Sequence, residues 1–365
     1  MAPHIGRFQT LTLSWSSPSV LNIAKVFCSP APVLERLKIR SCGSHFVAIE
    51  NALFNGDFSS LRELRLNAVV TNLPWRDLSM LTTFDFVQCV LDAKTSVTQL
   101  LNFFERAPLL REIKLVHSLP SFSDAPTERV VSLPRLKWLE ISAYPAHSTL
   151  LNHLRIPTRA SVRLGFSLED RNTKIRDYLP RSLDALSNIS HITSIRLGFK
   201  SGTAMWLGGP SGALGLNGVV ERSSIDPTND HRIEFLDELP ISTTKRLAIY
   251  QYRIPEIKVY QTLLTMNNLH TLILKDCINI SFFFVLNPAL NPSNTVLCPK
   301  LEVLILDAQE REAFYANDLL GMVEERASRG AKLLAIVITC PYNTVSENEL
   351  SSLRRCASRV EHVVR

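Results

Sequence analysis

A short pattern of apolar residues, L-x-x-L-x-L, recurs along almost the whole chain of 365 residues and constrains its fold more than any other feature. One copy reads Leu61-Arg-Glu-Leu64-Arg-Leu66, and a later one reads Leu301-Glu-Val-Leu304-Ile-Leu306. Other copies begin at Phe8, Leu34, Leu81, Leu110, Leu136, Ile192, Leu269 and Leu333, and weaker ones lie near 161–166 and 244–249. The first copies are 26, 27 and 20 residues apart and the last are 32 and 32 apart, a spacing typical of repeat proteins.

The pattern predicts both strands and helices. Apolar and polar residues alternate within each copy, as in a short strand with one buried face. The segments that connect one strand to the next are predicted to be helices. The clearest candidates are residues 97–107, Ala313–Arg329 followed by Gly330, and a helix that is capped by Ser346 and runs to about Val360. Residues 361–364 could add a terminal strand. This order predicts an α/β fold, a leucine-rich repeat solenoid of about 11–13 irregular repeats, curved, with parallel strands on its concave side and helices on its convex side.

We expect residues 1–365 to form a single leucine-rich repeat domain, with polar insertions near 118–131 and 200–230. The second insertion contains Gly208-Gly-Pro-Ser-Gly-Ala-Leu-Gly215. This stretch lacks the spacing of a phosphate-binding loop, so a loop or a degenerate repeat with tight turns is the favoured interpretation. Both insertions are expected to lie on a rim of the repeats.

Charge and composition favour an ordinary surface. The 40 Lys and Arg against 34 Asp and Glu give a net charge of +6, with the two signs interspersed along the chain, so we expect no nucleic acid partner. No run of about 18 apolar residues and no secretory signal is present, so we expect an intracellular protein, in cytoplasm or nucleus, with no membrane partner. Its seven cysteines are then most simply reduced thiols.

No motif in the sequence carries catalytic chemistry. The histidines and cysteines lack the spacing of metal ligands, and neither a nucleophile elbow nor a kinase signature is present. Cys42, Cys89 and Cys277 each lie three residues past the last apolar position of a repeat, where a small thiol fits the turn out of the strand. We therefore expect no enzyme activity, no cofactor and no metal.

The residues between the strand leucines are the candidates for partner binding, because they point away from the core. Arg36, Lys38 and Arg40 form either an anchor for an acidic or phosphorylated partner segment or a solubilising edge. In the later strands Ala248, Ile273, Ile305 and Val337 make an apolar column, which is either covered by the chain's own segments or exposed to a partner. The full set of candidates is Arg36, Lys38, Arg40, Arg65, Trp138, Tyr250, Ile273, Ile305 and Val337.

Several stretches resemble the basidiomycete F-box proteins with leucine-rich repeats: Phe103–Leu115, Leu133–Leu139, Arg181–Ile189 and Cys298–Leu304. The resemblance extends over most of the chain, roughly Phe8–Val337. It implies repeats that select a protein substrate for an SCF ubiquitin ligase, whose receptors dock through an F-box on the Skp1 adaptor of a cullin.

No F-box-like L-P-x-E segment precedes Phe8, and the internal Leu179-Pro-Arg-Ser lacks the helices that would follow. Skp1 and cullin are therefore expected as partners only if an F-box lies upstream. The alternative function is a repeat-only scaffold or regulator unrelated to ubiquitination, for example one acting on a small GTPase.

Overall fold

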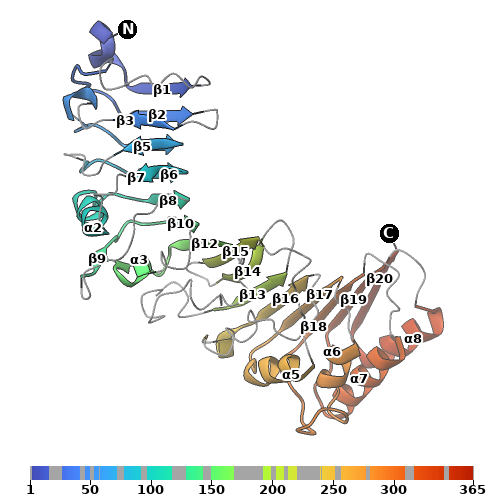
Figure 1. The fold of residues 1–365 in the computed structure, drawn as a ribbon. Helices are drawn as coiled ribbons and strands as arrows, with labels where there is room; N and C mark the ends of the chain where they lie inside the picture. The colour runs from blue at the N-terminus through green and yellow to red at the C-terminus, as the bar shows by residue number, and fades with distance from the viewer. Residues whose placement is uncertain are drawn as a thin grey trace. The chain divides into compact units, whose positions relative to one another are not determined.

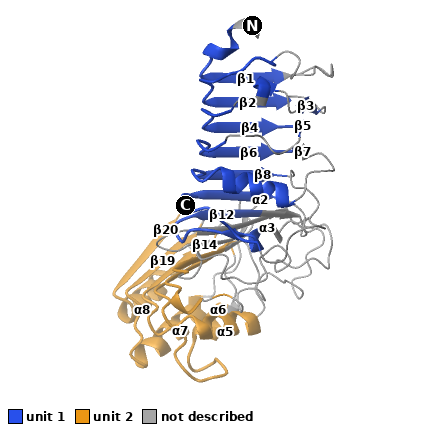
Figure 2. Ribbon diagram, turned by 90° about the vertical axis from the view of Figure 1, so that its left-hand side faces the viewer, with its two compact units in different colours: residues 1–190, 211–214 blue, residues 191–210, 215–365 orange. Residues whose placement is uncertain are grey.

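A computed structural model of the chain describes residues 2–15, 27–41, 46–49, 53–56, 58–71, 78–91, 97–116, 129–142, 149–167, 192–198, 203–208, 213–219, 239, 241–250, 256–276, 280–308, 316–340 and 345–364. The chain divides into two compact units (Figure 2). Unit 1 comprises residues 1–190 and 211–214, and unit 2 comprises residues 191–210 and 215–365. Each unit contains a mainly parallel sheet and helices, so the α/β class is established, while the single domain expected from the sequence stays a prediction.

The main sheet of unit 1 follows the repeats in chain order (Figure 1). Its strands are β1 (Thr10–Trp15), β2 (Arg36–Ser41), β4 (Glu63–Asn67), β6 (Thr83–Val87), β8 (Glu112–Val116), β10 (Trp138–Ser142) and β12 (Ser161–Ser167). Neighbouring strands are parallel and in matching register, so that Leu37 lies beside Leu64 and Leu64 lies beside Phe84. Each strand falls on one predicted copy of the apolar pattern.

The sheet of unit 2 is built in the same way. Its parallel strands are β13 (Ser194–Gly198), β16 (Arg246–Tyr250), β17 (Thr271–Lys275), β18 (Val303–Asp307), β19 (Ala335–Cys340) and β20 (Arg359–Val364). β14 (Thr203–Gly208) pairs antiparallel with β13, and β15 (Ala213–Val219) follows it in sequence. Part of the segment expected as a polar insertion at 200–230 is therefore strand, while most of 118–131 lies outside the described residues.

The same backbone hydrogen bonds recur from repeat to repeat. The first leucine of a copy closes a turn with the residue three positions earlier, as Leu61 N does with Phe58 O at 2.9 Å and Leu301 N with Cys298 O at 2.9 Å. At the strand start, one carbonyl accepts from two successive amides of the next strand. Glu35 O does so in unit 1, at 2.8 and 3.0 Å, and His270 O does so in unit 2, at 2.9 Å twice. The repeats thus share backbone geometry as well as sequence.

The helices of unit 2 are α5 (Glu256–Thr265), α6 (Ile280–Leu286), α7 (Ala316–Ser328) and α8 (Glu347–Cys356). Figure 1 shows them side by side along one face of the sheet. Ser346 caps α8 in a reciprocal capping box with Glu349, as the sequence predicts, and Gly330 follows α7 with a φ of 82°. The prediction that this last helix reaches about Val360 is wrong, because α8 ends at Cys356 and β20 begins at Arg359.

In unit 1, several connections between the main-sheet strands are not the helices that the sequence pattern predicts. Among its described residues, only α2 (Val97–Arg106) and the short α3 (Thr149–Asn152) are α-helices. After β2, β4 and β6 the chain instead forms β3 (Val47–Ile49), β5 (Val69–Thr71) and β7 (Val90–Leu91), which pair as a second parallel sheet. β9 (Val131–Ser132) and β11 (Leu154–Arg155) pair likewise. The 20-residue repeat at Leu61 leaves little length for a helix, and the β-branched residues of these segments favour strands.

In three repeats, the residue directly after the strand has a left-handed backbone conformation. Ala68, Gln88 and Asp276 have φ values of 53°, 52° and 51°, each directly after a strand. Their amides donate to the next strand along, at Val87, Val116 and Asp307. Cys89 follows this turn, is buried and donates its thiol to Val87 O at 3.3 Å, as expected of a structural thiol, whereas Cys42 and Cys277 lie outside the described residues.

The core consists of the repeat leucines and their equivalents. Leu37, Leu64, Leu272, Leu304 and Ile336 are at most 1% exposed.

The described strands of each unit form no curled sheet, so the curvature and the concave side predicted from the sequence are not observed. We call the side of each sheet that carries the residues between these leucines the outer face, as with Lys38 in β2 and Ile305 in β18.

Candidate interaction surface

The matching register arranges the outer face of unit 1 in rows that cross the strands. The central row carries, from β2 to β12, Lys38, Arg65, Asp85, Lys114, Glu140 and Arg163. Neighbouring strands lie about 4.8 Å apart, so each charged side chain inside the row, from Arg65 to Glu140, has a charged neighbour on either side, whereas Lys38 at the β2 end lies beside Thr12 of β1. A row of this kind can pair with charged groups of a partner in a fixed order.

Four predicted residues meet at one end of this face. Arg36, Lys38 and Arg40 lie exposed on β2, and Arg65 lies on the adjacent β4. Glu63 holds two of them, because its carboxylate lies 2.6 Å from Arg65 Nε and 3.9 Å from Arg36 Nε. Among the described residues, no carboxylate lies within ion-pair distance of Lys38 or Arg40. Of the predicted cations, these two are the most available for an external anion.

Asp85 occupies the middle of the central row between Arg65 and Lys114. Its Oδ1 is buried and accepts no hydrogen bond from the described residues. Burial raises the pKa of this carboxyl, although Lys114 and Arg65 act in the opposite direction. Farther along the row Lys114 pairs with Glu140 at 3.4 Å, so this part of the face is balanced internally.

Trp138 lies apart from the four cations, since β6 and β8 separate β10 from β4. Its side chain is on the outer face between Glu112 and Ser161, and it is 39% exposed. An exposed tryptophan on a rigid strand is a suitable anchor for a protein partner.

The apolar column predicted in unit 2 is a true row, in which Ala248, Ile273, Ile305 and Val337 occupy matching positions of β16 to β19. It is not uniform. Ala248 and Ile273 are buried, at 3% and 7% exposed, while Ile305 and Val337 are only half-buried. One end of the row is therefore buried, and the other end is partly accessible.

Polar contacts flank this row. The guanidinium of Arg196 lies 5.7 Å from the ring centre of Tyr250, a cation–π arrangement. Lys275 and Asp307, which are register partners, form an ion pair at 2.6 Å with both side chains largely buried. Sequence reasoning placed Tyr250 on this face but missed the Lys275–Asp307 pair, because only the register brings residues 32 positions apart together.

On the helix side, sequence reasoning also missed a buried arginine. Arg326 of α7 is 0% exposed and donates to the carbonyls of Leu297 (2.7 Å) and Cys298 (3.0 Å), just before β18. Burial lowers its pKa and raises that of the Cys298 thiol to about 12. Arg326 thus fastens α7 to the preceding repeat by satisfying two buried carbonyls.

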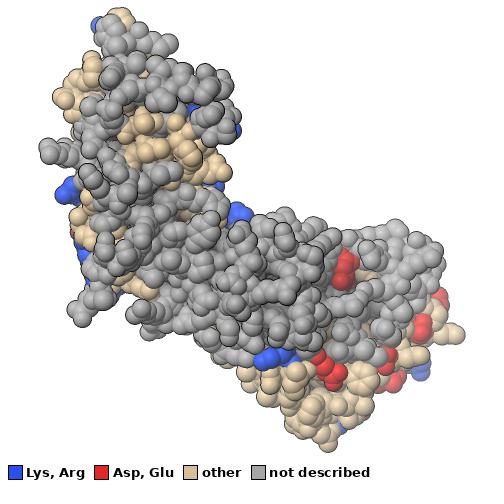
Figure 3. All heavy atoms as spheres, viewed as in Figure 1, with Lys and Arg blue, Asp and Glu red and all other residues tan. Residues whose placement is uncertain are grey.

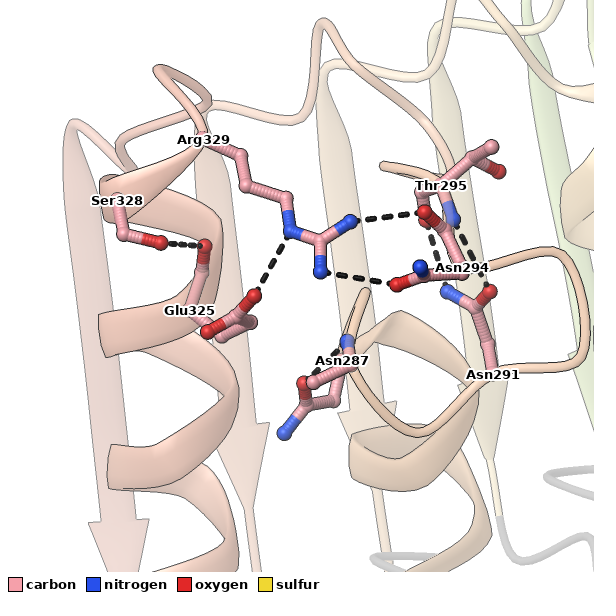
Figure 4. A network of polar contacts seen from close by, with 8 residues as sticks. Asn287, Asn291, Asn294, Thr295, Glu325, Ser328 and Arg329 are labelled. Atoms are coloured by element: carbon pink, nitrogen blue, oxygen red, sulfur yellow. Dashed lines mark hydrogen bonds and ion pairs between the residues drawn. The ribbon is translucent and has the colours of Figure 1, made fainter.

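Arg329, one turn later, holds the outside of the same segment (Figure 4). It contacts Glu325 at 2.7 Å and both oxygens of Asn294 at 2.8 and 2.9 Å. Asn291 in turn donates to Thr295 O at 2.8 Å. Figure 4 shows these side chains bridging the end of α7 and the 287–295 segment, so the network has a structural role.

One further contact joins the last two strands, where Cys340 Sγ lies 3.2 Å from His362 Nε2. The described residues contain no group of three or more His, Cys, Asp or Glu side chains that could hold a metal ion. Within the same residues, no helix is long and apolar enough to cross a membrane.

Comparison with the models of known protein families finds no match to this chain. A search of the curated proteins likewise finds none.

Proposed function

We propose that this chain is a protein–protein interaction module, built as a leucine-rich repeat solenoid, that binds its partner through the outer faces of its sheets. The observation that carries the proposal is the recurrence of one hydrogen-bonded strand start in both units, with the polar or apolar residues between the leucines aligned in rows. Repeats that place side chains in register offer a long, rigid surface, which is how repeat architectures bind partners.

The class of partner follows from the resemblance to F-box proteins with leucine-rich repeats. We propose that the repeats select a protein substrate for a ubiquitin ligase of the SCF type. The accessible part of the outer faces supports a protein partner, because it mixes an aromatic anchor at Trp138, half-buried aliphatics at Ile305 and Val337, and exposed cations on β2. This mixture is typical of protein interfaces.

Affinity capture from a basidiomycete lysate tests the proposal, with the chain as one bait and a version extended upstream to any F-box as the other. We expect both baits to recover the same substrate protein, and the extended bait alone to recover Skp1 and cullin. Capture of the adaptor by the unextended chain would show a docking element within residues 1–365.

A matched bait carrying Trp138→Ala and Ile305→Ala controls for nonspecific binding, since a genuine partner should be recovered less well by it. If neither wild-type bait recovers the adaptor and one other protein dominates, the chain is a repeat-only scaffold instead. Recovery of no protein above the control would overturn the interaction module itself.

A further inference from the structure

The start of the chain is unusually basic for a protein with mixed charge. Residues 1–49 contain the cations Arg7, Lys25, Arg36, Lys38 and Arg40 but only one acidic residue, Glu35. In the view of Figure 3, most of the visible Asp and Glu atoms lie on unit 2. The positive excess of the chain is therefore concentrated at the first repeats.

Two of these cations have no carboxylate in register with them on the neighbouring strands. Lys38 lies in register with Thr12 of β1 and Arg65 of β4, and Arg40 lies in register with Ser14 of β1 and Asn67 of β4. We call Thr12, Ser14, Lys38, Arg40, Arg65 and Asn67 the β2 patch. Its neutral members are hydrogen-bonding side chains, so it contains donors for an anion and no acidic group of its own.

The patch differs from the rest of the row in its charge balance. Farther along, Lys114 pairs with Glu140, and Asp85 lies between two cations. At the β2 end Glu63 is shared by Arg36 and Arg65, and Asp85 beside Arg65 acts on Lys38 without forming an ion pair with it. Lys38 and Arg40 are therefore exposed side chains with no ion pair to another described residue.

We infer that the β2 patch binds an extended acidic segment of the partner protein; this inference rests on the proposed function. Lys38 and Arg40 are two residues apart on one strand, so their side chains emerge about 7 Å apart. Carboxylates on alternate residues of an extended peptide have the same spacing. The guanidinium of Arg40 can bind one of them with two parallel hydrogen bonds, and Lys38 can neutralise the next.

Fluorescence anisotropy with a labelled peptide of four Glu-Thr repeats tests this inference directly, with the Gln-Thr peptide as the uncharged control. We expect the full chain to bind the acidic peptide, and Lys38→Glu with Arg40→Glu to weaken binding at least about tenfold. The matched variant carries Arg354→Glu and Arg355→Glu on α8, which makes the same change in net charge elsewhere and should alter binding less than about twofold.

Equal losses of peptide affinity in the two variants would show that the net charge of the chain attracts the peptide. That result would overturn the inference that the β2 patch is the binding site. Tighter binding of an oligothymidine than of the acidic peptide would also overturn it, in favour of a nucleic acid site. Thermal melts of both variants confirm folding, and Lys38→Gln with Arg40→Gln gives a milder replacement.

The two experiments distinguish a failure of the β2-patch inference from a failure of the proposed function. If the acidic peptide does not bind but a captured partner still binds the chain, the patch falls and the interaction module stands. If no partner is captured while the peptide binds at the patch, the proposed function loses its support.

Discussion

At the scale of single residues, the structure separates positions that stabilise the fold from positions that face outward. In β18, Leu304 and Leu306 are fully buried, whereas the alternate Val303 and Ile305 are half-buried. This division follows from strand alternation and could be predicted from the sequence. What the sequence could not supply is the burial of an outer-face residue such as Ile273, which depends on what lies above the sheet.

Replacing Leu304 by Ala should lower the free energy of unfolding by about 2–5 kcal/mol, because it removes a buried side chain and leaves a cavity. Lys38→Ala should leave that free energy nearly unchanged, since Lys38 is exposed and has no described ion pair. Urea unfolding of both variants measures the difference. Equal and small effects would mean that the buried and outer faces are assigned the wrong way round.

Asp85 gives a pH-dependent prediction. Its pKa is raised above the ordinary 3.8 by burial, so the folded chain holds this proton more tightly than the unfolded chain. Its contribution to stability is therefore full below the ordinary pKa and is lost as the pH rises through the folded value. Asp85→Asn should gain stability relative to wild type as the pH rises from about 4 to 7. A difference between the two proteins that does not change with pH would refute the assignment.

At the scale of elements, the repeat pattern predicts the strands well and the connections poorly. All the main-sheet strands in the described residues except β14 and β15 lie on copies of the apolar pattern or at the expected terminal strand, since alternation over five or six residues is a local signal. β3, β5 and β7 are too short to show a period, and they form by pairing with each other. Helix α5 was also missed, and its exposed Ile257 and Leu264 obscure the amphipathic pattern.

Of these connections, the contact between α7 and the segment before β18 should be the one whose loss lowers the free energy of unfolding most. Arg326→Ala leaves two buried carbonyls without a donor and should cost about 2–5 kcal/mol. Arg329→Ala, just past the end of α7, removes an exposed ion pair with Glu325 and two exposed hydrogen bonds to Asn294, and should cost less, about 1 kcal/mol. Chemical denaturation of the two variants compares them, and a larger loss for Arg329→Ala would contradict the role given to Arg326.

At the scale of the whole molecule, the two units repeat one construction but present different outer faces. Unit 1 carries charged rows with a basic end, and unit 2 carries an aliphatic row that is half-buried at Ile305 and Val337. The charged residues were identifiable from the sequence, but their pairing was not, because Glu63 with Arg36 and Lys275 with Asp307 meet only through strand register. Within each unit, strand register sets the order of the side chains along the outer face.

The most direct test of the central claim is the affinity of a captured partner for three forms of the full chain, measured by calorimetry. One is wild type, one carries Trp138→Ala and Val337→Ala on the outer faces, and one carries Ile257→Ala and Leu264→Ala on α5, where both side chains are exposed. The account predicts at least about tenfold weaker binding for the outer-face form and an unchanged affinity for the α5 form. Loss of binding in the α5 form, with full affinity in the outer-face form, would contradict it.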